Sequence, residues 1–213
     1  METLPPDIDD IVFNPTMWAD MRAVVTPIVE PILREAYALG AELAALQPSA
    51  RPRIVTAQRD YEPEVIDALA QSTARAQIED WWGQFTSTTQ REMQRQILRA
   101  RAEGRGTQWL MEQLEPMFGA TRALRIATTE ITRLMGAGAQ ATYRQMGYPG
   151  WEWRTVRDKA VCSTCHALNN VQYPQAVPFQ PAHVGCRCWP VPVTSPTTLR
   201  MPMPASTGLL RAG

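Results

Sequence analysis

All four cysteines of the 213-residue chain lie between Cys162 and Cys188. Together with His183 they have the spacing C-x2-C-x17-H-x2-C-x-C. A C-x2-C turn directs two thiolates at one point, and ligands from a distant hairpin complete the tetrahedron that zinc prefers. Because the N-terminus lacks the charged and apolar regions of a secretory signal, we expect a reducing compartment, where such a cluster more often binds metal than forms disulfides. The sequence therefore predicts a structural zinc site, with two disulfides or unlinked thiols as the alternatives.

Five candidate ligands compete for the four positions of such a site: Cys162, Cys165, His183, Cys186 and Cys188. One interpretation uses the first three and one of the last two cysteines. In the other, Cys186 and Cys188 both bind because alternate residues of a strand face the same way, and His183 donates a hydrogen bond to a sulfur. A catalytic zinc would keep a position for water, and the sequence offers no nucleophile and base pattern. We therefore expect a non-enzymatic protein.

Helical periodicity dominates the chain before the cysteines. It predicts helices over residues 17–47, 62–81, from 87 or 88 to 104 or 106, 107–118 and 121–145. Pro27 and Pro31 should kink or split the first helix, and Gly83 should end the second. The last helix carries an expected core stripe and small residues that permit close approach of another helix. The stripe comprises Leu124, Ala127, Ile131, Leu134, Gly138 and Ala141, and the small residues are Gly136, Gly138 and Ala139.

After Gly150 the pattern changes to the period-two alternation of a half-buried strand, from Trp151 to Val156. The expected fold is thus mainly α, with an N-terminal helical region, a small zinc-stapled α+β C-terminal module and a flexible Pro-rich tail. No apolar run reaches the ~18 residues of a membrane-spanning helix, so no membrane segment is expected. The segments are an extended lead-in (1–16), an acidic helical arm (17–83), an Arg-rich helical region (84–150), a zinc-knuckle module (151–193) and the flexible tail (194–213).

Charge is distributed unevenly although the net charge is +0. Residues 1–83 carry 14 acids against 6 bases, and residues 84–213 carry 7 acids against 15 bases. Such asymmetry permits head-to-tail packing, an electropositive partner for the first half, or nucleic acid near the second, and by itself it selects none of these. The third predicted helix presents four arginines that are candidates for facing DNA: Arg91, Arg95, Arg99 and Arg101. The alternative is a solvated helix face on which these arginines pair with Glu92 and Glu103.

The order of motifs resembles that of a known family. It comprises Arg122-x2-Arg-Ile-Ala127-x-Thr-Glu130, Trp153-x4-Asp158, Cys-x2-Cys165 and Pro181-x-His183-x2-Cys-Arg-Cys188. Over roughly residues 87–193 the chain is similar to the phage Mu F-like head morphogenesis proteins, also called minor head or minor capsid proteins. The helical motif of the family usually reads closer to Ala-Arg-Thr-Glu-Thr, and Asn170 stands where a glycine is expected. Asparagine can adopt the left-handed conformation that such a glycine supplies.

The resemblance implies a virion protein that is assembled with the procapsid in the host cytoplasm. It would bind the portal protein and other capsid proteins at the packaging vertex, in multiple copies around the portal, and assist head assembly or delivery of packaged DNA. Arg122, Glu130, Asp158 and Trp153 would be structural motif residues, with Glu130 paired to Arg133 or Arg122. The rival hypotheses are a zinc-dependent nuclease and a nucleic-acid-binding zinc module.

Overall fold

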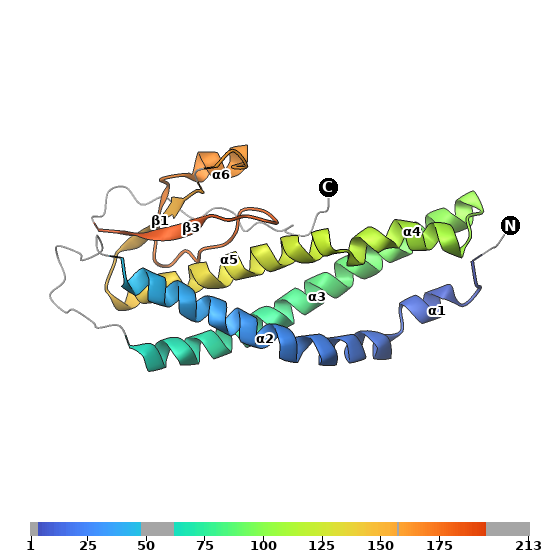
Figure 1. Cartoon of the computed structure of the whole chain (residues 1–213), viewed down its shortest axis with the longest axis horizontal. Helices are drawn as coiled ribbons and strands as arrows, with labels where there is room; N and C mark the ends of the chain where they lie inside the picture. The colour runs from blue at the N-terminus through green and yellow to red at the C-terminus, as the bar shows by residue number, and fades with distance from the viewer. Residues whose placement is uncertain (1–3, 48–61, 157, 195–213) are drawn as a thin grey trace.

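The computed structural model describes residues 4–47, 62–156 and 158–194 (Figure 1). The long helices run along the long axis of the molecule, and a small sheet lies at one end (Figure 1). This arrangement confirms the mainly α fold with a small α+β module at its C-terminal end. In chain order the elements are α1 (Ile8–Val12), α2 (Pro15–Ala45), α3 (Pro63–Glu103), α4 (Thr107–Phe118), α5 (Ala120–Gln145), β1 (Gly150–Arg154), α6 (Ser163–Leu168), β2 (Gln172–Pro174) and β3 (Trp189–Val193).

Helix α2 is a single helix of 31 residues. The Asn14 side chain caps it by accepting a hydrogen bond from the Thr16 amide at 2.9 Å. Pro27 and Pro31 lie inside this helix, so of the two expected effects, a kink or a split, the split does not occur. Both prolines are on the exposed side, where water can satisfy the carbonyl groups that lose their intrahelical donors.

Helix α3 is longer than the sequence predicts. It spans 41 residues, or roughly 60 Å at 1.5 Å per residue, and passes through Gly83, so the expected stop at Gly83 is wrong. A glycine inside a helix costs only about 0.5–1 kcal/mol relative to alanine, which the burial of neighbouring side chains such as Trp82 and Met93 outweighs. The helix ends, as predicted, at Gly104, whose φ of 62° is left-handed. Before α2, residues 8–12 form the short helix α1 in place of an extended lead-in.

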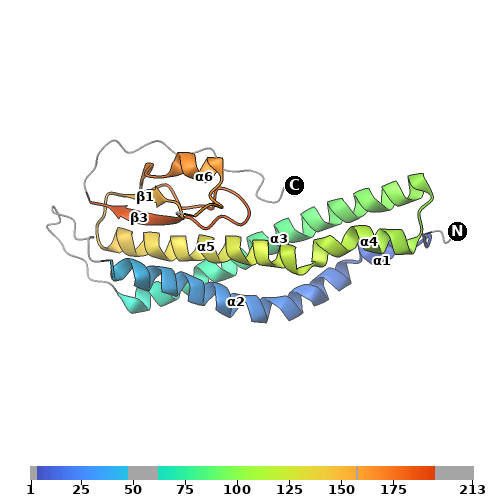
Figure 2. The same cartoon turned by 45° about the horizontal axis from the view of Figure 1, so that its top comes forward.

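Helices α2 and α5 pack closely because small residues meet at their crossing (Figure 2). A Cβ atom on Gly138 would lie 2.0 Å from the Tyr37 carbonyl oxygen, and one on Gly40 would lie 2.0 Å from that of Met135. The Thr142 hydroxyl donates a hydrogen bond to the Ala41 carbonyl at 3.1 Å. The small residues of α5 therefore permit close helix approach, as predicted, and α2 is the helix that approaches.

The rest of the predicted α5 stripe is only partly correct. Leu124, Ala127 and Ile131 are exposed, whereas Leu134 and Gly138 are buried. Further along, α2 covers one face of α5 and the sheet covers another, so the second half of the helix is buried around much of its circumference. Three polar side chains of α5 are buried as well: Thr129, Gln140 and Thr142.

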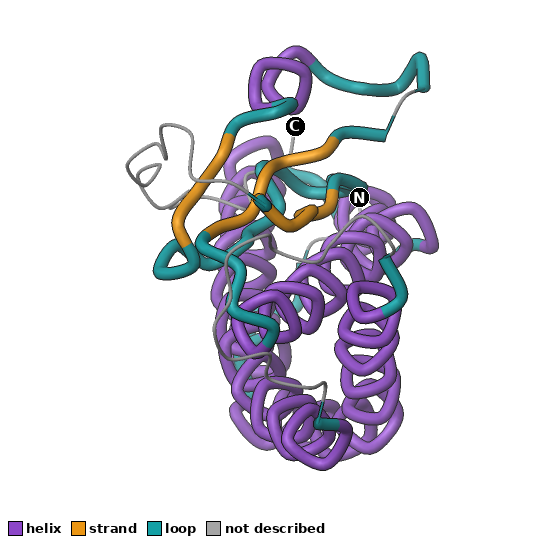
Figure 3. The backbone as a smooth tube through the Cα atoms, turned by 90° about the vertical axis from the view of Figure 1, so that its left-hand side faces the viewer, coloured by secondary structure: helices purple, strands orange, loops and turns teal. Residues whose placement is uncertain are grey.

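The sheet is antiparallel with the strand order β2-β1-β3. It lies between α5 and α6 (Figure 3). Aromatic rings fill the space between the sheet and α5: Trp151 stacks on Tyr173 at 4.5 Å between ring centroids, and Trp153 lies 5.1 Å from Phe179. Gly136 makes room for the Phe179 ring. Residues 195–213, most of the predicted tail, are outside the described residues, and none of the described helices is both long and apolar enough to cross a membrane.

Candidate metal centre

The first two cysteines are positioned by the start of α6. Cys162 is the N-cap residue, and its Sγ accepts a hydrogen bond from the Cys165 amide at 3.4 Å. This backbone hydrogen bond lowers the pKa of the Cys162 thiol. Cys165 follows on the first turn and is buried. The C-x2-C spacing thus brings both sulfur atoms to the same end of one short helix.

A tight turn positions the second half of the cluster. The Cys186 amide donates to the His183 carbonyl at 3.1 Å, and Gly185 adopts the positive φ of 78° that a type II turn requires at its third residue. His183 Nδ1 lies 2.9 Å from the Val184 carbonyl oxygen. Because a carbonyl can only accept, Nδ1 carries the proton and Nε2 keeps a free lone pair for a metal.

The sulfur–sulfur distance in the cluster agrees with a tetrahedral zinc site, whereas the sulfur–nitrogen distances are shorter than in such a site by about 0.4–0.5 Å. His183 Nε2 lies 3.2 Å from Cys162 Sγ and 3.1 Å from Cys165 Sγ, and Cys165 Sγ lies 3.8 Å from Cys186 Sγ. Usual zinc bond lengths place two sulfurs about 3.8 Å apart, and a sulfur and a nitrogen about 3.6 Å apart. All five predicted ligands are therefore gathered around Cys165.

Cys165 occupies the centre of this cluster. It belongs to two groups, within each of which all ligand atoms are less than 4.8 Å apart: Cys162, Cys165 and His183, and Cys165, Cys186 and Cys188. All four cysteines are free thiols, so the disulfide alternative is not the arrangement in this structure. His166, next to Cys165, is exposed and outside both groups.

The thiols of the cluster differ in their readiness to lose a proton. A hydrogen bond from Cys188 lowers the pKa of Cys186 to about 5. Burial raises the pKa of Cys165 to about 12, and the hydrogen bond to Cys186 together with burial raises that of Cys188. A thiolate at Cys186 is therefore stabilised by neighbouring thiols that keep their protons. A metal ion must displace those protons to bind.

Thr129 connects the ligand turn to α5, and the sequence interpretation did not assign it a role. Its hydroxyl accepts a hydrogen bond from the Gly185 amide at 2.8 Å and donates one to the Arg125 carbonyl at 2.7 Å. Thr129 belongs to the helical Thr-Glu motif, and its place on the buried side of an amphipathic helix is the signal that would have identified it. Asp158 and Arg187 add a second brace across the knuckle, with an exposed ion pair at 2.7 Å.

Glu130 holds helices together beside the cluster. Its carboxylate lies 3.3 Å from Arg133 Nε and accepts a hydrogen bond from Gln77 of α3 at 2.7 Å. Arg133 also donates to the Gln180 side chain in the loop before the ligand turn. Burial raises the pKa of the Glu130 carboxyl. The Glu130 partner is thus Arg133, one of the two that the sequence left open.

Arg122 of α5 connects this helix to α3 and α4. It donates to the Met117 carbonyl at the end of α4 at 2.9 Å and to the Thr89 hydroxyl of α3 at 3.2 Å. Its guanidinium also lies over the Phe85 ring, 5.2 Å from the centroid. Trp153, the last of the predicted motif residues, is buried in the aromatic core of the sheet. Arg122 and Trp153 therefore both contact the rest of the fold.

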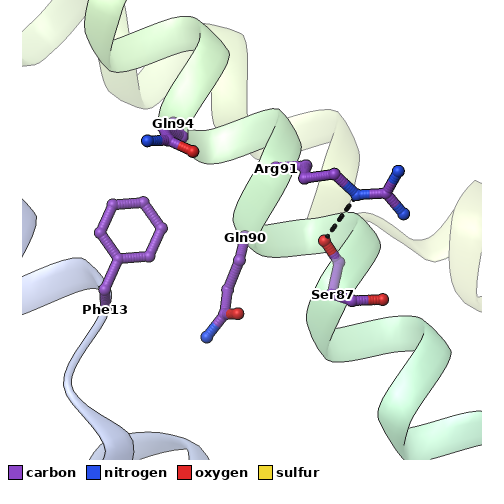
Figure 4. Close-up of a pocket in the computed structure, with 5 residues that line it drawn as sticks. All are labelled: Phe13, Ser87, Gln90, Arg91 and Gln94. Atoms are coloured by element: carbon purple, nitrogen blue, oxygen red, sulfur yellow. Dashed lines mark hydrogen bonds between the residues drawn. The ribbon is translucent and has the colours of Figure 1, made fainter.

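The arginines proposed to face DNA are largely engaged by carboxylates. Arg95 pairs with Glu92 at 2.5 Å, Arg99 with Glu103 at 2.8 Å, and Arg101 with Asp9 at 2.6 Å. Arg91 donates to the Ser87 carbonyl at 3.2 Å. It lines an open pocket of about 350 Å³ with Phe13, Gln90 and Gln94, and its side chain extends away from Phe13 (Figure 4).

The fold and the site define a class: a mainly helical protein that carries a compact Cys/His module suited to a structural metal. The family described as Phage Mu protein F like protein has a model that matches residues 91–191. This region holds α5, β1, β2, the start of β3 and the whole Cys/His cluster, and it is similar to the Mu F-like family, a family of phage head morphogenesis proteins. No curated protein and no solved structure matches the chain.

Proposed function

We propose that the chain is a phage minor head protein, a non-enzymatic adaptor that joins the portal vertex during procapsid assembly and DNA packaging or delivery. The observation that carries the proposal is the family match over α5 and the Cys/His module. The motif residues support it, because Thr129, Glu130 and Asp158 brace the module through hydrogen bonds and ion pairs and so have structural roles. The protein would then belong to the virion.

Zinc is the structural cofactor that suits this module. Four of the five side chains would hold the ion, with Cys165 among them because both groups share it. The ion would replace hydrophobic core that a segment of this size cannot build alone. It would also fix the loop around His183 to α6, so that the aromatic core beneath stays closed.

The zinc proposal is tested by measuring metal content of the full chain with mass spectrometry, and thermal unfolding with and without a chelator. We expect about one zinc per chain and a lower melting temperature after chelation. Cys165→Ser and His183→Asn should lose the metal, whereas His166→Asn, an exposed neighbour outside the cluster, should retain it. Wild-type protein without metal, or metal loss in the His166 control alone, would contradict the site.

The adaptor proposal requires binding to the portal of the same phage. The acidic first half is the candidate contact surface, but deleting residues 1–83 would cut α3 and remove the α2–α5 core. Charge reversal at exposed acidic residues tests the same surface without removing part of the core. Glu64→Lys with Asp67→Lys reverses two exposed acids on the first turns of α3, and Glu112→Lys with Glu115→Lys makes the matched change on α4.

In sedimentation assays with assembled portal rings, we expect the wild type and the α4 variant to bind. The α3 variant should bind more weakly, with the difference shrinking at high salt because the contact is electrostatic. Absence of wild-type binding would refute the adaptor role. Equal binding of the two variants would refute the assignment of the acidic half as the contact surface.

A further inference from the structure

Helix α2 carries apolar residues on two sides. One side, with Leu33, Tyr37 and Ala41, is buried against α3 and α5. The other bears six large apolar side chains that are 44–68% exposed. We call this set the outer face of α2; it consists of Val24, Ile28, Ile32, Leu39, Leu43 and Leu46. At 100° per residue all six fall within an arc of about 100°, so they share one side of the helix, which they also share with the exposed Glu35 and Glu42.

The stripe differs from the scattered apolar residues that are normal on a protein surface. It runs from Val24 to Leu46, along most of α2. Contiguous apolar patches of this kind mark interaction sites in soluble proteins. Its members are exposed in the single chain, so an occupant must come from outside the part of the chain that the structure describes.

The order of residues in the stripe identifies the occupant. Position numbers add to 70 for Val24 and Leu46, and to 71 both for Ile28 with Leu43 and for Ile32 with Leu39. The outer face is therefore close to symmetric about a point between residues 35 and 36. A second α2 helix, laid antiparallel across the first, brings each of these pairs into contact twice. Such self-complementarity is what a two-fold symmetric dimer interface requires.

The area of the outer face is also sufficient. Burying these six side chains on both copies removes roughly 1,200 Å² from water, which reaches the lower end of the range for specific interfaces and exceeds that of most crystal contacts. Neighbouring residues on the same side, among them Pro31 and Ala38, would add to it. The area therefore fits a reversible dimer.

We propose that two copies of the chain associate through the outer faces of their α2 helices, antiparallel about a two-fold axis near residues 35 and 36. This inference is independent of the portal contact and of zinc. Glu35 lies within the arc of the stripe and close to the axis, where two carboxylates approach each other. Glu35→Gln should therefore lower the dissociation constant of the dimer. The wild-type dimer, which keeps both carboxylates, should also become tighter as salt screens their repulsion.

Sedimentation equilibrium of the full chain over a range of concentrations tests the association. We expect a monomer–dimer equilibrium for the wild type. Ile32→Lys and Leu39→Glu should each raise the dissociation constant at least about tenfold. Leu98→Glu, a matched change at a side chain of α3 that is 57% exposed, should leave it unchanged. Circular dichroism checks that each variant is folded.

Mixing the two variants tests the register. A heterodimer of Ile32→Lys with Leu39→Glu places Lys opposite Glu at one contact and restores the Ile32–Leu39 pair at the other, so dimers should reappear. A mixture of Ile28→Lys with Leu39→Glu should not restore them, because these positions do not face each other. A wild type that stays monomeric, or dimers that persist in both single variants, would overturn the proposal. So would dimerisation that appears only after deletion of residues 195–213, because that segment would then be the occupant.

Discussion

Gly138→Ala should destabilise the protein strongly because the new methyl group has no space at the α2–α5 crossing. The Cβ atom would lie 2.0 Å from the Tyr37 carbonyl oxygen, against at least 3.4 Å for an ordinary contact. The obstacle is backbone, so the helices must separate by roughly 1.4 Å. Overpacking of this kind costs up to about 3 kcal/mol, and stretching the Thr142–Ala41 hydrogen bond costs about 1 kcal/mol more. The better helix propensity of alanine returns about 1 kcal/mol.

The expected net loss is therefore about 3 kcal/mol in the free energy of unfolding. For a chain of this size that corresponds to a fall of roughly 6–12 °C in Tm. Gly83→Ala is the matched control, because a Cβ atom there has no neighbour within 4 Å. It should stabilise α3 by about 0.5–1 kcal/mol. Urea unfolding followed by circular dichroism measures both variants, and equal effects of the two substitutions would refute the packing argument.

Three further predictions concern the surroundings of the cluster. Thr129→Val leaves the Gly185 amide without its acceptor; we expect a loss of about 1–3 kcal/mol and faster release of zinc to a chelator, measured with a colorimetric indicator. Burial raises the pKa of the Glu130 carboxyl in the folded protein. The protonated Glu130 side chain therefore stabilises the folded state fully below its unfolded pKa of about 4.3, and this stabilisation is lost as the pH rises through the folded-state pKa. The stability of Glu130→Gln relative to wild type should therefore increase between about pH 4 and pH 7, as followed by urea unfolding, and a constant difference would contradict this reasoning. Zinc must displace thiol protons, including that of Cys165, so its apparent affinity should increase with pH, and calorimetry in buffers of different ionisation enthalpy should detect proton release.

The sequence was most informative where local chemistry determines the geometry. Cys162 and Cys165 are held by the cap and first turn of one helix, so the C-x2-C spacing alone predicted that their sulfur atoms would converge. Asn170 adopts a φ of 65°, the left-handed conformation expected at the position where the family has glycine. The left-handed end of α3 at Gly104 was likewise a local signal.

The errors arose where tertiary packing outweighed local preference. Gly83 is a weak helix breaker inside a helix whose buried side chains continue past it, and Pro27 and Pro31 lie on the exposed side of α2. The role of Thr129 depends on a contact with Gly185, which is 56 positions away. Periodicity also cannot distinguish an apolar face that meets the core from one that remains exposed, and for this reason the expected core stripe of α5 included Leu124 and Ile131, which are exposed.

The contact between α2 and α5 has a consequence for how the protein is made. Thr142 and Ala41 are 101 positions apart, so at about 5–20 residues per second the ribosome completes α5 roughly 5–20 s after α2. In that interval α2 can pair only with the nascent α3, and the surface around Gly40 and Gly138 is not yet assembled. Folding is then expected to proceed from an α2–α3 hairpin that later receives α5, with closure of the long chain segment as the slow step.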